Sequence, residues 1–113
     1  MRPYGIHEVI REAGKYHLPI YITENGLGDH GEADKLRGQY ITDIFEQLEL
    51  SLKDGADLRG PQRGLLRGYF HWSLIDNFEW GSGYSIKFGL HDINRKPKWS
   101  SKIYKKIIED LKN

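Results

Sequence analysis

The sequence contains no cysteine. Disulfides, zinc–thiolate sites and thiol nucleophiles are therefore excluded, and the chain is compatible with a reducing compartment, which makes the cytoplasm the default location. A strong charge of either sign is also missing, because the formal net charge is +1 over 113 residues. No stretch approaches the roughly 20 apolar residues that span a bilayer, and residues 1–5 lack the apolar core of a signal peptide. We expect one soluble domain with no nucleic-acid and no membrane partner.

Metal-binding patterns are missing as well. The five histidines show no spacing such as HExxH, and none is closely paired with another: His7, His17, His30, His71 and His91. We expect no metal and no other cofactor. His71 is better explained as a hydrogen-bonded structural residue than as a catalyst. The lysines between residues 96 and 106 follow an amphipathic helix, so a solvated face explains them better than an RNA site.

Hydrophobic periodicity is present and predicts the first half of the fold. Apolar residues at helical spacing predict a helix over residues 4–15, with Pro3 suited to its start. Residues 18–23 predict a strand that the Asn25-Gly26 turn closes. A longer amphipathic helix is expected over about residues 34–53, with Gly55 as its C-cap.

The second half is predicted in the same way. Residues 59–68, in which Arg-Gly pairs surround a proline, predict a loop. A strand with bulky side chains on both faces, as in a strand buried on both sides, is expected over residues 68–75. Residues 84–93 predict a short hairpin or an irregular loop, and residues 99–111 a closing helix that Ser100 or Ser101 could cap.

This alternation of helices and strands is typical of parallel βα units. In such folds the working residues lie at the C-terminal ends of strands. Glu24 takes that place after the first strand, and the second strand is followed by Asp76, Asn77, Glu79 and Trp80. A strand end can hold a carboxylate rigidly, and the turn after it leaves room for a ligand. Judged alone, however, a glutamate before Asn-Gly is more often a solvated turn residue.

Three runs of sequence in a fixed order turn this pattern into a resemblance. YITENG (residues 21–26) is followed by WSLIDNFEW (72–80) and then by GYSIKFGL (83–90). Together they resemble the C-terminal part of glycoside hydrolase family 1, the β-glucosidases and β-galactosidases, and most closely its archaeal-type members. The resemblance covers nearly the whole chain. It implies an α/β fold in which residues 1–113 form a single partial domain, the C-terminal part of a (βα)8 TIM barrel with about its last two strands and flanking helices, incomplete on its own.

The resemblance also implies a role for each matching residue. Glu24 would be the nucleophile in the retaining hydrolysis of β-glucosides or β-galactosides, which needs no cofactor. Trp72 would be the aromatic platform under the sugar, although a tryptophan of the barrel core is the plain alternative. The other side chains implied in binding the β-linked glycoside substrate are Glu79, Trp80, Phe88 and Asn77. Phosphosugar-specific relatives are expected to carry serine at position 79 and tyrosine at 88, and a carboxylate at 79 would repel phosphate, so we expect unphosphorylated substrates.

The sequence departs from the family in two places. The general acid and base of the family lies in an Asn-Glu-Pro motif, which this sequence lacks, and a (βα)8 barrel takes about 250 residues. We therefore expect a fragment that begins at an internal methionine and whose unpaired sheet edges require a missing N-terminal barrel portion or self-association. Residues 61–68 are expected to be an insertion before the second strand. The alternative hypothesis is a non-catalytic truncated remnant, or a sugar-binding or interaction module.

Overall fold

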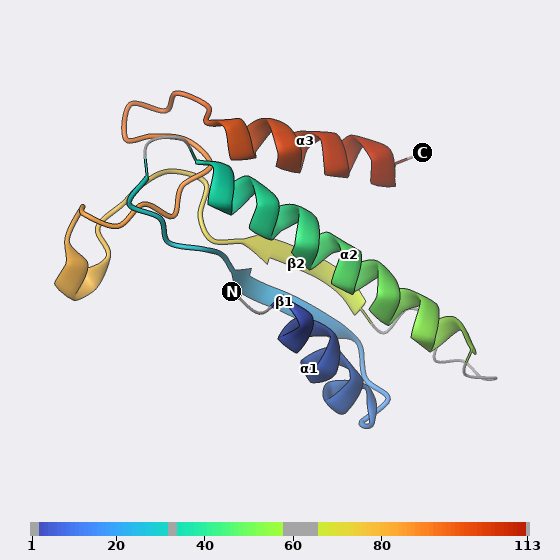
Figure 1. Cartoon of the computed structure of the whole chain (residues 1–113). Helices are drawn as coiled ribbons and strands as arrows, with labels where there is room; N and C mark the ends of the chain where they lie inside the picture. Colours follow the sequence, from blue (N-terminus) through green and yellow to red (C-terminus); the bar gives the residue numbers. More distant parts are fainter. Residues whose placement is uncertain (1–2, 32–33, 58–65, 113) are drawn as a thin grey trace. The chain divides into compact units, whose positions relative to one another are not determined.

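The computed structural model describes residues 3–31, 34–57 and 66–112. Three helices, two strands and one short 3-10 helix follow one another within these residues (Figure 1): α1 (Tyr4–Gly14), β1 (Ile20–Asn25), α2 (Lys35–Asp57), β2 (Leu66–His71), η1 (Trp80–Ser82) and α3 (Trp99–Leu111). The predicted order of helices and strands is confirmed. None of the helices in the described part of the chain is long and apolar enough to cross a lipid bilayer.

The chain divides into two compact units. The first unit comprises Met1–Glu24 and Asp43–Phe70, and the second comprises Asn25–Thr42 and His71–Asn113. The boundary therefore falls inside β1, inside α2 and inside β2. Each unit is considered by itself below.

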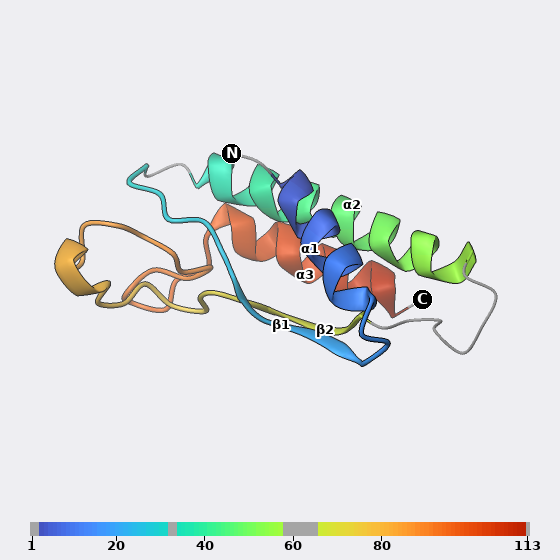
Figure 2. The same cartoon turned by 90° about the horizontal axis from the view of Figure 1, so that it is seen from below.

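The first unit is a two-stranded sheet with helices on one side (Figure 2). The arrows of β1 and β2 point the same way in Figure 1, as expected for two strands joined through a helix. The buried apolar side chains of this unit come from the helices: Ile10, Ile44 and Leu48. Phe45 of α2 meets Tyr69 of β2 edge to face, with ring centroids 4.9 Å apart, so the later turns of α2 are packed on the sheet.

The other face of this sheet is open among the described residues. Tyr21 of β1 and Phe70 of β2 are both more than half exposed, whereas Ile20 and Ile22 on the opposite face of β1 are half-buried. The prediction that the second strand is buried on both sides is therefore wrong for the residues described, because helices cover only one face.

The second unit is built on the first turns of α2 and on α3. A Cβ atom at Gly38 would overlap the indole ring of Trp99, so the glycine allows the two helices to approach closely. Ile41 and Ser100 are fully buried in this unit. The predicted cap at Ser100 or Ser101 is wrong: α3 has no side-chain cap at its own N-cap residue, Lys98. Instead the carboxylate of Asp34 accepts the backbone N–H of Ser100 at 2.6 Å, because a distant acidic side chain lies at the helix start.

Other predicted boundaries also need correction. The first strand runs over Ile20–Asn25 instead of residues 18–23. Gly55 does not cap α2, which continues to Asp57, since an interior glycine weakens a helix without having to end it. The second strand begins at Leu66 and ends at His71 instead of running over residues 68–75. It ends early because the N–H of Ser73 donates to Phe88 at 3.1 Å and so leaves the ladder.

The two predicted loops have different outcomes. Of the predicted loop at 59–68, residues 66–68 lie in β2, while residues 59–65 lie outside the described residues. Residues 84–93 form an irregular loop with isolated bridges, not a hairpin, so the second of the two alternatives is confirmed.

Candidate active site

Glu24 lies on β1, one residue before the strand ends. The strand alternates between half-buried and exposed side chains up to Thr23, and then breaks the pattern, because Thr23 and Glu24 are both exposed. Hydrogen bonding along the strand fixes its backbone, so the carboxylate starts from a rigid position and projects into solvent. Glu24 belongs to the first unit.

The next residue, Asn25, begins the second unit and is held from two directions. Its side-chain amide donates to the hydroxyl of Tyr40 at 3.1 Å, and its backbone carbonyl accepts the N–H of Trp72 at 2.8 Å. A Cβ atom at Gly26 would overlap the carbonyl oxygen of Trp72. The glycine of the Asn-Gly turn is thus explained by the close approach of two backbones.

Trp72 and Glu79 are brought together in the loop that follows β2. The indole Nε1 of Trp72 donates to Oε1 of Glu79 at 3.1 Å, and the indole remains 38% exposed. The N–H of Glu79 donates to the carbonyl of Gly83 at 2.7 Å, which closes the turn around η1. An aromatic face and a carboxylate therefore lie next to each other at an exposed position.

Asn77 and Trp80 belong to the same loop. Nδ2 of Asn77 donates to Oγ of Ser73 at 3.2 Å and to the carbonyl of Ile75 at 3.1 Å, so this amide stabilises the loop itself. Trp80 opens η1 with a positive φ of 47°, and its side chain is 85% exposed. A tryptophan with so little protein around it is available for a ligand or a partner surface.

Phe88 reaches the same unit from a second segment. Its ring and the side chain of Ile86 fill the space that a Cβ atom at Gly28 would occupy, and Phe88 is half-buried. Its carbonyl accepts the N–H of Ser73, the residue after Trp72. The second unit thus gathers Trp72, Asn77, Glu79, Trp80 and Phe88, while Glu24 stands in the first unit.

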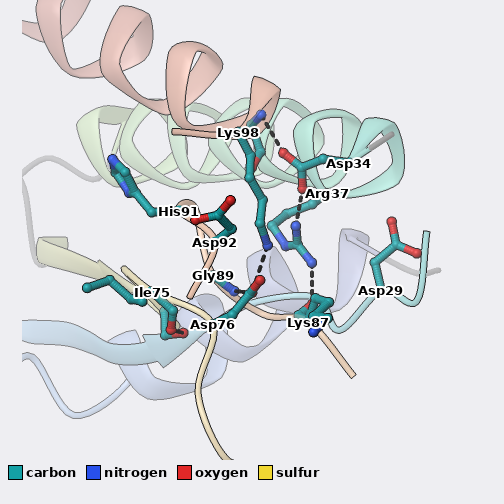
Figure 3. A network of polar contacts seen from close by, with 12 residues as sticks. Asp29, Asp34, Arg37, Ile75, Asp76, Lys87, Gly89, His91, Asp92 and Lys98 are labelled. Carbon is teal, nitrogen blue, oxygen red and sulfur yellow. Dashed lines mark hydrogen bonds and ion pairs between the residues drawn. The ribbon is translucent and has the colours of Figure 1, made fainter. Parts of the chain in front are cut away.

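A network of buried charges supports these loops (Figure 3). Arg37 of α2 is 1% exposed. Its guanidinium pairs with Asp34 and donates to the carbonyl oxygens of Leu27, at 3.1 Å, and of Lys87. One arginine therefore ties residue 27, just after the Asn-Gly turn, to residue 87, next to Phe88. The sequence patterns do not predict a role for Arg37. The local signal for its ion pair is an aspartate three residues before an arginine at the start of a helix.

A second buried pair lies beside the first. Asp76 accepts from Nζ of Lys98 at 2.7 Å and from the N–H of Gly89 at 2.8 Å. The sequence position of Asp76 predicts a place at a strand end, and the spacing of the lysines predicts a solvated face for Lys98. That assignment is wrong for Lys98, because its side chain is only 16% exposed and points to a buried carboxylate.

The environment of His71 suits a structural residue. Burial first, and then the positive charge of Arg37, lower the pKa of its imidazole from 6.5 to about 4. Its ring lies 5.8 Å from that of Tyr104. A histidine that is neutral at pH 7 and surrounded by packing is a poor proton donor there. Within residues 3–31, 34–57 and 66–112, no group of three or more His, Asp or Glu side chains could hold a metal ion.

Comparison with known proteins places the chain in a family. The model of glycosyl hydrolase family 1 matches residues 1–113. The chain is 41% identical over 92 residues to a β-galactosidase of Pyrococcus woesei, with 81% of this chain and 16% of that protein covered. It is 38% identical over 111 residues to a β-galactosidase of Saccharolobus solfataricus, with 93% and 21% covered.

Solved structures agree with the sequence matches. A β-glycosidase from Pyrococcus horikoshii superimposes with a TM-score of 0.78 at 34% identity, over 93% of this chain and 24% of that one. A family 1 β-glucosidase from Thermotoga maritima, in complex with isofagomine lactam, gives a TM-score of 0.79 at 30% identity, over 95% and 26%. These proteins are β-glycosidases, and the chain belongs to glycosyl hydrolase family 1. It spans about a fifth of the length of the curated relatives it matches.

Proposed function

We propose that this chain carries the nucleophile and several sugar-binding side chains of a retaining β-glycosidase, as the last two strands and flanking helices of a (βα)8 barrel. The observation that carries the proposal is the hydrogen bond between Trp72 and Glu79, in a loop whose backbone is bonded to Asn25, the residue directly after Glu24. Family membership supplies the reaction class, and the side chains supply the chemistry.

Glu24 is proposed to attack the anomeric carbon. In a retaining mechanism an ionised carboxylate forms a glycosyl-enzyme, and water then hydrolyses it. An exposed carboxylate on a hydrogen-bonded strand is available to a substrate and is limited in its motion by the backbone. Both properties are required of this nucleophile.

The loop after β2 is proposed to hold the sugar. The apolar face of a pyranose packs on an aromatic ring, which Trp72 offers. Glu79 accepts one bond from that indole and, as a carboxylate, has further lone pairs for sugar hydroxyls. The indole N–H of the exposed Trp80 is a donor for the same purpose, and Asn77 and Phe88 complete the proposed contacts. The carboxylate at position 79 favours uncharged glycosides over phosphorylated ones.

The sequence lacks the Asn-Glu-Pro motif that would supply the general acid and base. Proton transfer to the leaving group contributes typically about 10² to 10⁴ in rate. A substrate whose leaving group needs no proton avoids this requirement in the first step. The reactivity of Glu24 can therefore be tested on this chain without the second carboxyl group.

The test is covalent trapping with a 2,4-dinitrophenyl 2-deoxy-2-fluoro-β-glucoside, followed by mass spectrometry of the peptide that contains Glu24. We expect one fluoroglycosyl group on Glu24 in the natural chain and none in Glu24→Gln. Glu46→Gln is the matched control, because Glu46 is also exposed and its loss should leave the adduct unchanged. Modification at other carboxylates, or equal labelling of Glu24→Gln, would disprove the assignment.

A second candidate function follows from the division of the chain, because the proposed binding residues lie together in one unit and Glu24 lies in the other. A module that binds sugar without cleaving it would need only the second unit. Titration with glucose, followed by tryptophan fluorescence, separates the two functions. Binding without any adduct on Glu24 would favour the binding module, whereas binding together with the adduct supports the glycosidase.

A further inference from the structure

We infer that the buried Asp76–Lys98 ion pair is a positioning device for the sugar-binding loop, and that binding of the sugar depends on it although neither side chain touches the sugar. The role of the loop rests on the proposed function. The position of the pair rests on the contacts described next; Figure 3 shows the pair beside Gly89.

Asp76 lies at the point where three stretches of backbone meet. Its side chain is 7% exposed and receives the charged amine of Lys98 at 2.7 Å and the N–H of Gly89 at 2.8 Å. Its own N–H donates to the carbonyl of His91 at 3.0 Å, and the N–H of Lys98 donates to Leu90 at 2.9 Å. Residues 76, 89–91 and 98 are thus joined through one carboxylate and the backbone around it.

This junction leaves no room for adjustment. A Cβ atom at Gly89 would overlap the N atom of Asp76 and the carbonyl oxygen of His91. The backbones are therefore in direct contact, and a change in the Asp76 side chain must move one of them. On one side of the junction lie Trp72 and Glu79, four residues before and three residues after Asp76. On the other side lies Phe88, the neighbour of Gly89.

The charge of the pair matters because the site is buried. A carboxylate shielded from water is stabilised by the amine that faces it, and removal of the amine leaves an uncompensated charge. The unpaired carboxylate of Asp76 is then more stable when it turns toward water, and this movement breaks its contacts with Gly89 and His91. We expect the hydrogen bond from the Trp72 indole to Glu79 to weaken first, because both residues belong to the loop that Asp76 fixes.

The experiment compares Lys98→Met, Lys98→Arg and Lys106→Met in the full chain. Lys106 pairs with Asp110 on the same helix, but both side chains are mostly exposed, at 73% and 64%, so this variant is a control for loss of a lysine and of an ion pair. Two quantities are measured in variants whose folding is checked by circular dichroism: the indole N–H resonance of Trp72 and the affinity for deoxynojirimycin as a sugar-shaped probe.

We expect Lys98→Met to shift the Trp72 indole resonance and to weaken probe binding about tenfold, the loss that follows from misplacing one charge-assisted hydrogen bond. Lys98→Arg keeps the charge and should restore most of the affinity. Lys106→Met should leave both quantities as in the natural chain. An unchanged Trp72 resonance and affinity in Lys98→Met would overturn the inference.

Two further outcomes are decided by the same measurements. If circular dichroism shows that Lys98→Met unfolds, Asp76→Asn gives the test, because asparagine keeps the shape and an acceptor for Gly89. A shift of the Trp72 resonance, with that of Trp99 unchanged, supports the inference, and no shift of Trp72 refutes it. If the natural chain does not bind the probe, the proposed function fails, whereas the Trp72 resonance still decides whether the pair positions the loop.

Discussion

Replacing Asp34 tests how much of the second unit depends on one buried carboxylate. Both of its oxygens are used: one pairs with the guanidinium of Arg37, and the other accepts the N–H of Ser100 at the start of α3. In Asp34→Asn only one oxygen remains, so an amide NH₂ must face a donor. Asparagine is nevertheless the right substitution, because Asp34 has a positive φ of 55° that asparagine tolerates and alanine does not.

The expected loss is about 3 kcal/mol of unfolding free energy. Breaking one partner of a buried ion pair costs about 3 to 5 kcal/mol, and loss of a helix N-cap about 0.5 to 2 kcal/mol. The two losses are not additive, because they share one side chain, and asparagine still satisfies one of the two donors. The lower end of the ion-pair range is therefore the reasonable value.

Urea unfolding followed by circular dichroism measures this loss, provided that the m-value is unchanged between variants. Asp110→Asn is the matched control, because Asp110 forms an exposed ion pair with Lys106 on α3; it should change the free energy by less than about 0.5 kcal/mol. If Asp34→Asn is as stable as Asp110→Asn, the buried carboxylate does not hold α3, and the reasoning from burial and capping is refuted.

Two other perturbations follow from the same structure. Burial and the charge of Arg37 hold the pKa of His71 at about 4 in the folded chain, below its ordinary value of 6.5. The unfolded chain therefore takes up the proton first as the pH falls, and the free energy of unfolding should decrease between about pH 6.5 and 4, by at most about 3 kcal/mol. Urea unfolding of His71→Phe across this range should lack that decrease, and an identical pH dependence would contradict the assignment. Gly26→Ala should lower the free energy of unfolding by about 1 to 3 kcal/mol, because its Cβ atom would overlap the backbone of Trp72. Gly81→Ala is the control and should change this free energy little, because a Cβ atom there meets open space. Equal stability of the two variants would refute the close approach.

Local patterns predicted the elements of this fold well. The closing helix at residues 99–111 is confirmed at both ends, and the first helix to within a residue. Helical and strand periodicities are properties of neighbouring residues, so they can be read from one stretch of sequence. The three motif runs predict the family, which the comparisons confirm.

The incorrect predictions concern interactions between distant residues. Ser100 lies at the right place in the sequence to cap α3, but the cap comes from Asp34, 66 residues earlier. Lys98 follows the same spacing as the exposed lysines of α3, and only the fold brings it to Asp76. No local pattern contains these pairs, because a chain must fold before residues so far apart meet.

The proposed nucleophile and the proposed sugar-binding residues are held in two different ways, and this predicts how each of them is lost. Glu24 stands on a strand, so its position depends on backbone hydrogen bonds that few side-chain substitutions remove. Trp72 and Glu79 stand on a loop whose shape depends on Asp76 and Lys98, two buried charges that a single substitution leaves unpaired. Moderate disturbance of the second unit should therefore weaken sugar binding before it alters the intrinsic reactivity of the carboxylate on β1. In the trapping experiment, such variants should need more fluoroglycoside for half-maximal labelling of Glu24 but should reach the same final extent of labelling. A loss of labelling that saturating reagent does not restore would contradict this division of roles.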